Sequence, residues 1–275
     1  MSLIHLTAWD LALAAALVVA LGVLSVPMRL GLARPLLIAA ARAAIQLYLI
    51  GLVLNALFGA VRWYWVALTA LIMLAAAGYE VYARQQKPFA GWFGVAIGPL
   101  SLFVSSFAIV VLTLTVVVAP TPWYHPQYAI PVLGMLLGNT MTGVALALGR
   151  LTDGMRRDCA GIEGRLLLGQ TARQATLTHR QAAWRAALVP TLNAMATAGI
   201  VSLPGMMTGQ ILAGSPPVEA AKYQWLILLL IVAGTGFGVM IAVEWGCRRL
   251  FDDRQRLRLE RLRTDRNGVS AGKPH

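Results

Sequence analysis

The stretch 190–217 combines side chains that could contact a solute with a break in an apolar run. Its first half is apolar enough to cross a membrane, Leu203-Pro204-Gly205 interrupts it, and the apolar piece 206–213 is too short to cross alone. Proline removes a backbone donor and glycine loosens the chain, and lipid tolerates such a break only where the freed backbone is buried in protein or lines a cavity. We therefore expect a broken segment beside a transport path. The predicted path residues here are Asn193, Met195, Pro204, Gly205, Met206, Met207, Thr208 and Gln210, and the stretch also contains the neutral polar residues Thr191, Thr197 and Ser202.

The adjacent methionines Met206 and Met207 are the candidate metal ligands of this stretch. Thioether sulfur is a soft donor that suits Cu(I) and suits hard cations poorly. Methionine is more often a flexible packing residue, so both interpretations stay open.

A second group of neutral polar side chains lies in the apolar run 128–149, within the sequence GNTMTG. Polar groups at mid-span need hydrogen-bond partners in lipid. Neighbouring helices could supply those partners, or the groups could line a path together with Asn193. We include Asn139, Thr140, Met141 and Thr142 in the predicted translocation path.

The sequence contains no grouping of residues that suits catalysis. The four histidines, at positions 5, 125, 179 and 275, are far apart, and no HExxH, GxSxG or GxxxxGK[ST] motif occurs. The two cysteines, Cys159 and Cys247, have no companion histidine and make no zinc site. We therefore expect no enzymatic activity and no cofactor on this chain.

The apolar composition predicts an all-α, polytopic integral membrane protein. The 275 residues are 58% hydrophobic and 12% charged, whereas a soluble domain carries about 25% charged residues. We expect about seven transmembrane helices, at 9–26, 36–58, 63–83, 93–119, 128–149, 186–203 and 224–245. They form a permease domain over residues 1–249, followed by a basic tail over 250–275.

The basic residues predict the orientation of these spans. Of the 23 Lys and Arg residues, 20 fall in connections on one side and two on the other. By the positive-inside rule, the N-terminus is outside and the tail 250–275 is cytoplasmic. The net charge of +12 is therefore topological, and we expect the tail to contact lipid and no nucleic acid to bind.

Arg42 and Glu80 are charged residues inside predicted spans. Arg42 could reach the headgroups by extending its side chain, or it could form an internal charge pair with Glu80. Glu80 also precedes Arg84 by four residues, which is the spacing of an ordinary helix pair.

The predicted cytoplasmic loop 150–185 has a pattern that suits a protein partner. Ile162, Leu166 and Leu167 recur at helical spacing, and Gly169 ends that run. Glu163 and Gly169 are six residues apart, as in the EAA-like loop by which membrane subunits of ABC transporters dock on their ATPase. We predict that this loop couples the chain to an ATPase through Glu163, Leu166, Leu167 and Gly169.

Taken together, these segments resemble the FetB-type family of iron-export ABC permeases. The resemblance rests on GMLLGNTMTG at 134–143, IEGRLLLG at 162–169 and VPTLNAMATAGIVSLPGMMTGQILAGSPPVEAAKYQ at 189–224, with weaker support from RAAIQLYLIG at 42–51. It implies a multi-pass permease of the bacterial inner membrane, present in two copies and driven by a separate P-loop ATPase that binds ATP.

The substrate that the resemblance implies is iron or a related metal ion. Two alternatives remain at the level of sequence. The first is ABC export of an organic solute such as a nucleotide sugar, because plant relatives of the family are linked to movement of UDP-glucose. The second is an ion-coupled carrier or channel that needs no ATPase.

Overall fold

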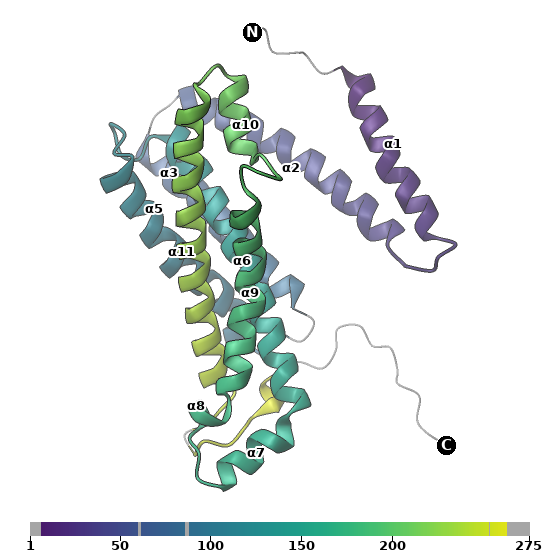
Figure 1. Cartoon of the computed structure of the whole chain (residues 1–275), viewed down its shortest axis with the longest axis vertical. Coiled ribbons are helices and arrows are strands. Elements are labelled where there is room, and N and C mark those ends of the chain that lie inside the picture. Colours follow the sequence, from purple (N-terminus) through teal and green to yellow (C-terminus); the bar gives the residue numbers. More distant parts are fainter. Residues whose placement is uncertain (1–6, 60–61, 86–87, 253, 263–275) are drawn as a thin grey trace. The chain divides into compact units, whose positions relative to one another are not determined.

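The computed structural model describes residues 7–59, 62–85, 88–252 and 254–262, and in these residues the chain is helical, with three isolated β-bridges and no strand (Figure 1). The chain divides into two compact units. The first comprises residues 1–62 with 212–214, and the second comprises 63–211 with 215–275.

The first unit is a pair of apolar helices, α1 (Ala8–Ser25) and α2 (Ala33–Gly59). A capping box starts α1, because the Thr7 hydroxyl accepts from the Asp10 amide and the Asp10 carboxylate accepts from the Thr7 amide at 2.8 Å. The two helices meet near Gly22, where a Cβ would make an ordinary van der Waals contact, 3.9 Å from the Ala33 Cα.

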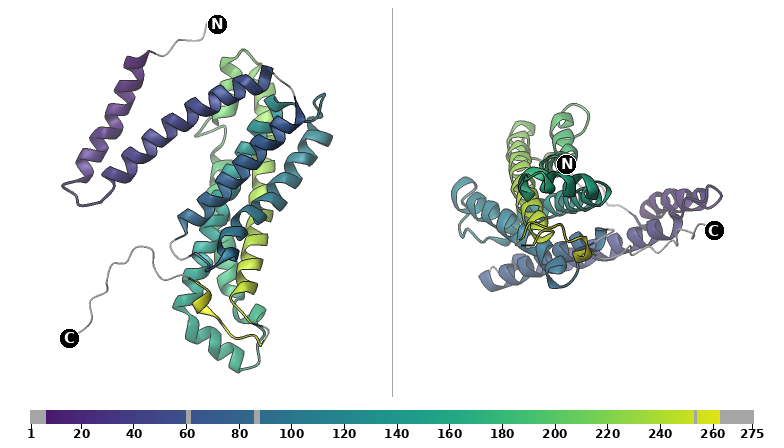
Figure 2. Two further views of the ribbon diagram at one scale, coloured as in Figure 1. Left: turned by 180° about the vertical axis from the view of Figure 1, so that it is seen from behind. Right: turned by 90° about the horizontal axis from the view of Figure 1, so that it is seen from below.

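The second unit is a bundle of long helices (Figure 2). Helix α6 packs along α3, α9 and α11, and α4 also packs along α3 and α11. The helical stretch Trp92–Val117 contains two π-helical turns, η1 and η2. The elements are α3 (Trp63–Arg84), α4 (Trp92–Leu102), η1 (Phe103–Phe107), α5 (Ala108–Leu112), η2 (Thr113–Val117), α6 (Pro126–Arg157), α7 (Cys159–Leu167), α8 (Ala172–Ala175), α9 (Leu177–Thr197), α10 (Gly205–Leu212), α11 (Pro217–Arg249) and η3 (Leu259–Arg261).

Small residues bring the central helices together. A Cβ on Gly238 of α11 would overlap the side chains of Thr140 on α6 and Ser105 on η1. A Cβ on Gly78 of α3 would likewise overlap Pro99 of α4. Close contact between backbones replaces the hydrophobic driving force that is absent between helices in lipid.

Five described helices are long and apolar enough to cross a membrane: Ala33–Gly59, Trp63–Arg84, Trp92–Val117, Pro126–Arg157 and Pro217–Arg249. They correspond to five of the predicted spans, and the first predicted span corresponds to the shorter apolar helix Trp9–Ser25. The predicted span 186–203 differs, since α9 begins at Leu177 and ends at Thr197. The all-helical membrane fold is therefore confirmed, while the number of spans and their orientation stay predictions.

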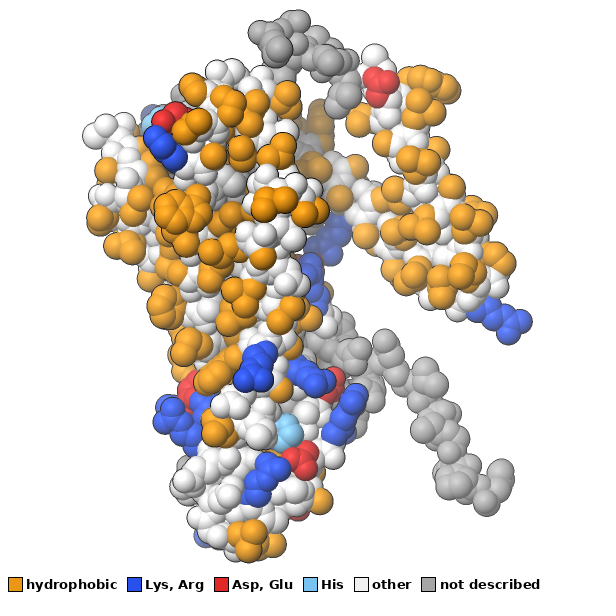
Figure 3. Space-filling model, viewed as in Figure 1, with side chains coloured by type: hydrophobic (Ala, Val, Ile, Leu, Met, Phe, Trp, Pro, Cys, Tyr) orange, Lys and Arg blue, Asp and Glu red, His pale blue; other side chains and the backbone are white. Residues whose placement is uncertain are grey.

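Helices α6 and α11 are longer than a bilayer requires. At 1.5 Å per residue, their 32 and 33 residues extend about 48–50 Å, against about 30 Å of hydrocarbon. Arg156 and Arg157 end α6, and Arg248 and Arg249 end α11. We call the end of the second unit where α6 and α11 terminate, together with the short elements that follow them, the basic end. Figure 3 shows blue side chains gathered there, below a surface that is mostly apolar.

Candidate docking end and translocation face

Helix α6 places the predicted GNTMTG residues on two different faces. Gly138, Asn139 and Thr142 are exposed on one face, Met141 is half-buried, and Thr140 is fully buried. The Asn139 Nδ2 donates to the Met135 carbonyl at 2.8 Å, and the Thr142 hydroxyl donates to the Gly138 carbonyl at 3.0 Å. Helix backbone therefore satisfies one hydrogen-bonding group of each exposed side chain.

Arg84 lies beside this exposed face of α6. Its guanidinium donates to the Thr142 hydroxyl at 3.4 Å, and its Nε lies 3.5 Å from the Glu80 carboxylate. The i,i+4 pair between Glu80 and Arg84 is thus present. Arg42 belongs to α2 in the first unit, so its predicted pairing with Glu80 stays a prediction.

Thr140 faces the bundle interior, where α6 meets η1 and α11. Thr140 and Thr235 are fully buried, and within the described structure their hydroxyls find no hydrogen-bond partner. Ser105, which is also buried, donates to the Ser101 carbonyl at 2.8 Å. Thr140 is therefore part of the helix packing in the interior and does not share the exposed face of Asn139 and Thr142.

The break in the predicted segment 190–217 lies earlier than the sequence suggests. Helix α9 ends at Thr197, whose carbonyl accepts from the amides of Val201 and Ser202 at 3.0 and 3.2 Å. Gly199 has φ +84°, a left-handed conformation that glycine adopts without strain. The Pro204 carbonyl accepts from the Thr208 amide at 3.1 Å, so Pro204 stands at the start of α10 and does not itself interrupt a helix.

The remaining predicted path residues are divided between α9 and α10. Asn193 is exposed and Met195 is half-buried on α9, whereas Met206, Met207, Thr208 and Gln210 are half-buried on α10. Helix α10 is not among the helices along which α6 packs. In the described residues, no group of three or more His, Cys, Asp or Glu side chains could hold a metal ion.

The basic end carries the predicted coupling helix, α7, at a corner fixed by Asp158. Asp158 connects α6 to α7, and its carboxylate accepts from the His179 Nε2 at 2.9 Å and from the Arg165 guanidinium at 3.3 Å. Arg165 also donates to the Ala175 carbonyl at 2.8 Å. One carboxylate therefore joins the α6–α7 corner to α9, and Arg165 extends the connection to α8.

Helix α7 ends with two leucines that project from the protein. Leu167 is 89% exposed and Leu168 is 85% exposed. Gly169 follows with φ +86°, its amide donates to the Leu166 carbonyl at 3.0 Å, and the Gln170 amide donates to the Arg165 carbonyl at 3.1 Å. This pattern is a Schellman motif, which requires a left-handed residue and therefore favours glycine.

An ion pair that the sequence patterns did not reveal joins α9 to α11 at the same end. The Arg180 guanidinium donates to the Glu244 carboxylate, which also accepts from the Arg248 Nε at 3.0 Å. Arg180 is almost completely buried. The two residues are 64 positions apart in the chain, and no local pattern marks Arg180 as the partner of Glu244.

Comparison with known proteins identifies the family. The model of the uncharacterised protein family UPF0014 matches residues 8–251. A UPF0014 membrane protein from Synechocystis is 37% identical over 83% of this chain and 87% of its own length. Protein ALUMINUM SENSITIVE 3 from Arabidopsis thaliana is 34% identical over 80% of this chain and 79% of its own.

A further relative carries a name that states a role. The Escherichia coli protein named "Probable iron export permease protein FetB" is 31% identical over 94% of this chain and 98% of its own length. No protein of solved structure matches the chain significantly. With several apolar helices and a family match over nearly its whole length, the chain is a multi-pass membrane protein that belongs to the UPF0014 family.

Proposed function

We propose that this chain is the membrane subunit of an ABC-type exporter, that a separate P-loop ATPase docks on α7, and that iron is the exported ion. The observation that carries this proposal is the construction of the basic end. A short helix with exposed Leu167 and Leu168 is fixed by Asp158 and Arg165 beyond the apolar part of the bundle. Rigid attachment is what a helix needs if it is to transmit movement from a partner.

The charge distribution supports an orientation for this arrangement. The basic end carries the excess of arginines that the positive-inside rule assigns to the cytoplasm, where ATP is available to a partner. Glu163, Leu166, Leu167 and Gly169 then belong to the ATPase-docking helix. The proposal thus has the chain in the bacterial inner membrane with its N-terminus outside.

The nature of the transported ion is proposed from the relative FetB and from the polar groups on α6, α9 and α10. The E. coli relative is named for iron export. Asn139, Thr142 and Asn193 offer neutral oxygens, and Met206 and Met207 offer thioethers.

We also propose that two copies of the chain assemble with two ATPase subunits, and that the exposed face of α6 meets its counterpart. Cysteines introduced at Asn139 in a chain lacking Cys159 and Cys247 should then crosslink to a dimer. A cysteine at Leu229, which is exposed on α11, provides the matched control and should crosslink less. Equal crosslinking from both positions would contradict this interface.

ATP-dependent transport in inside-out vesicles tests the function. Vesicles would contain this chain and its P-loop ATPase partner, and uptake of radioactive Fe²⁺ would be measured with and without ATP. The matched control is an ATPase whose P-loop lysine is replaced by alanine, which should abolish uptake. Uptake that survives in this control would establish an ion-coupled carrier or channel. ATP-dependent uptake of UDP-glucose in place of iron would establish the organic-solute alternative.

A further inference from the structure

The segment that follows α11 is a folded part of the basic end. We call residues 250–262 the C-terminal strap. Leu250, Phe251 and Leu262 are buried in it. The Arg258 amide donates to the Leu250 carbonyl at 2.7 Å, and the Asp252 amide donates to the Arg256 carbonyl at 3.2 Å. Helix α11 thus ends at Arg249, and the chain turns back in a tight hairpin.

The strap is attached at both of its ends and in its middle. Near its end, Leu262 forms a β-bridge with Phe89, and the Ala90 amide donates to the Arg261 carbonyl at 2.7 Å. In the middle, the Gln255 side chain accepts from the Ala172 amide at 2.8 Å. These contacts join the strap to the α3–α4 connection and to the start of α8.

Asp252 stabilises the hairpin of the strap. Its carboxylate accepts from the amides of Arg256 and Arg254 at 2.8 and 3.1 Å, and it pairs with the Arg256 and Arg258 side chains. The backbone hydrogen bond from Arg256, together with the nearby Arg256 and Arg258 side chains, lowers the pKa of Asp252 below its usual value. The carboxylate is therefore ionised at neutral pH and keeps the arginines in place.

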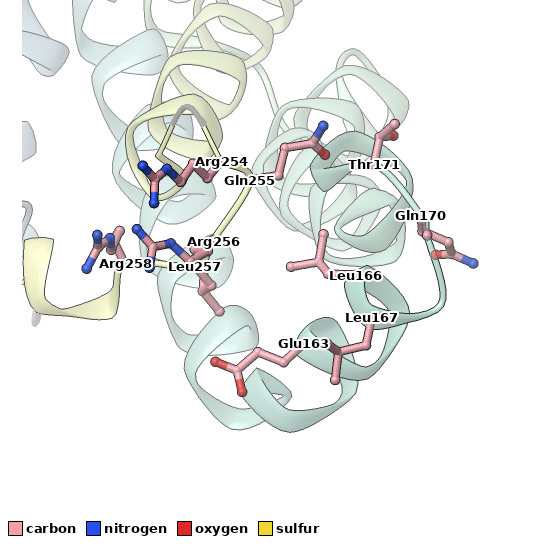
Figure 4. A pocket seen from close by; sticks show the side chains of 11 residues that line it. Glu163, Leu166, Leu167, Gln170, Thr171, Arg254, Gln255, Arg256, Leu257 and Arg258 are labelled. Atoms are coloured by element: carbon pink, nitrogen blue, oxygen red, sulfur yellow. The ribbon is translucent and has the colours of Figure 1, made fainter.

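A pocket of about 760 Å³ lies between the strap and α7. Figure 4 shows Arg254, Arg256 and Arg258 on the strap side, opposite Leu166, Leu167 and Glu163 on α7. Among the described residues, Arg254 has no carboxylate within ion-pair distance of its side chain, which is exposed. The α7 side of the pocket is thus apolar except for the Glu163 carboxylate. On the strap side Arg256 and Arg258 are paired with Asp252, whereas Arg254 has no such partner in the described residues. Gly169, Gln170, Thr171, Gln255 and Leu257 complete the lining.

The position of the pocket favours a protein as its occupant. Residues 150–157 of α6 extend about 12 Å past the apolar part of the helix, and α7 begins only after them. Leu167 and the strap therefore lie beyond the hydrocarbon of a bilayer. The apolar side chains Leu166 and Leu167, facing the exposed Arg254 that is unpaired among the described residues, are complementary to a protein segment that carries apolar and acidic side chains.

We propose that the C-terminal strap is one wall of the ATPase-docking surface and that the pocket takes an acidic segment of the ATPase flanked by apolar residues. This inference rests on the proposed function, since it names a second element of the same interface. It gives the basic segment after α11 a role in binding a protein, whereas the sequence suggested contact with lipid. The ATPase would then contact α7 and the strap together.

Arg254→Glu tests the inference, because its exposed side chain can change without removing a contact that the described structure uses. Affinity of the isolated ATPase subunit would be measured for the full-length chain in nanodiscs of phosphatidylcholine. We expect Arg254→Glu to weaken binding about tenfold or more, since reversing a charge at an interface replaces an attraction with a repulsion. Arg156→Glu, at an exposed arginine outside the pocket, should change the affinity less than about twofold.

The outcomes separate the strap from the coupling helix. Suppose that the wild-type chain binds the ATPase and that Gly169→Val weakens this binding. If the affinity of Arg254→Glu for the ATPase then equals that of Arg156→Glu, the inference about the strap is wrong and the proposed function stands. If the wild-type chain does not bind the ATPase, the proposed function fails. The affinity for the ATPase could instead fall in Arg254→Glu only when the nanodiscs contain phosphatidylglycerol. That result would show that the strap binds anionic lipid, and it would overturn the inference.

Discussion

The Asp158 carboxylate lies 2.9 Å from the His179 Nε2 and joins the corner between α6 and α7 to α9. The carboxylate accepts the hydrogen bond, which places a proton on Nε2 of the imidazole. The same carboxylate also accepts from Arg165 of α7. Asp158, whose side chain is 37% exposed, thus helps to orient α7 against the bundle, together with the hydrogen bond from Arg165 to the Ala175 carbonyl.

Asp158→Asn should loosen α7 without unfolding the bundle. The amide is similar in size, but it lacks the charge that pairs with Arg165, and bonds to charged groups contribute about 1.5–3 kcal/mol where they are shielded from water. Because Asp158 is partly exposed, we expect a loss of less than about 2 kcal/mol in unfolding free energy. We expect a loss of about tenfold in transport-coupled ATP hydrolysis by the complex.

Asp153→Asn provides the matched control for this prediction. Asp153 also lies on the last turns of α6 and is half-buried, but it does not contact α7 through any of the hydrogen bonds described above. ATP hydrolysis by this variant should stay within about twofold of wild type. Equal losses in both variants would indicate a general effect of charge at the basic end, and the positioning role of Asp158 would be wrong.

Gly169→Ala should weaken coupling because of backbone conformation alone. A Cβ at Gly169 meets no atom within 4 Å, but its φ of +86° lies in the left-handed region, where other residues cost about 1–2 kcal/mol. Gly164→Ala is the matched control, since Gly164 lies inside α7 with open space around it and without the positive φ. Alanine favours a helix interior over glycine by about 1 kcal/mol. Substrate-stimulated ATP hydrolysis by the complex should therefore fall severalfold in Gly169→Ala and be unchanged in Gly164→Ala. Equal ATP hydrolysis by the two variants would refute a role for the Schellman turn.

Cys159 should react slowly with maleimide at neutral pH. Burial raises the pKa of its thiol, and the Glu163 carboxylate raises that pKa further, since the thiol donates to it at 3.7 Å. A raised pKa leaves less thiolate, which is the reactive form. In a Cys247→Ser background, the labelling rate should keep increasing as the pH rises above 9.

Glu163→Gln separates the two causes of this shift. It removes the negative charge and leaves the partial burial, so labelling at pH 8 should become about two- to fivefold faster, because a lower pKa leaves more thiolate at a given pH. Arg165→Gln serves as the charge-change control on the same helix and should not speed labelling. A rate for wild-type Cys159 equal to that of free glutathione at pH 7.5 would contradict the prediction.

The long apolar helices could be predicted from the sequence, because lipid requires about 20 consecutive apolar residues in a spanning helix. Helices α3, α6 and α11 have this signal over much of their length. The start of α9 does not, since His179 and Arg180 lie in its first turns. These polar side chains are satisfied by Asp158 and Glu244, which are 21 and 64 residues away in the chain. No local pattern identifies such partners.

The predicted break shows a second limit of sequence patterns. Pro204-Gly205 is the more conspicuous signal, yet the helix ends at Thr197, where Ala198 is extended and Gly199 follows in a left-handed conformation. A proline at the start of α10 costs little, since the amide that it lacks would have no partner there. Gly169 was identified from its spacing to Glu163, and the Schellman turn provides a physical reason for that residue.

The replacement of Met206 and Met207 by alanine separates packing from metal binding on α10. Both side chains are half-buried, so loss of packing should cost less than the 2–5 kcal/mol of a fully buried methionine. If the thioethers contact the ion, transport should fall while the thermal stability of the purified chain changes little, and soft ions should be affected more than hard ones. Met240→Ala, at an exposed methionine on α11, is the matched control and should leave transport unchanged. Uptake of Fe²⁺ and Cu⁺ would be measured for the double variant in the ATPase-containing vesicles. Wild-type uptake of both ions by a normally folded double variant would remove Met206 and Met207 from the translocation path.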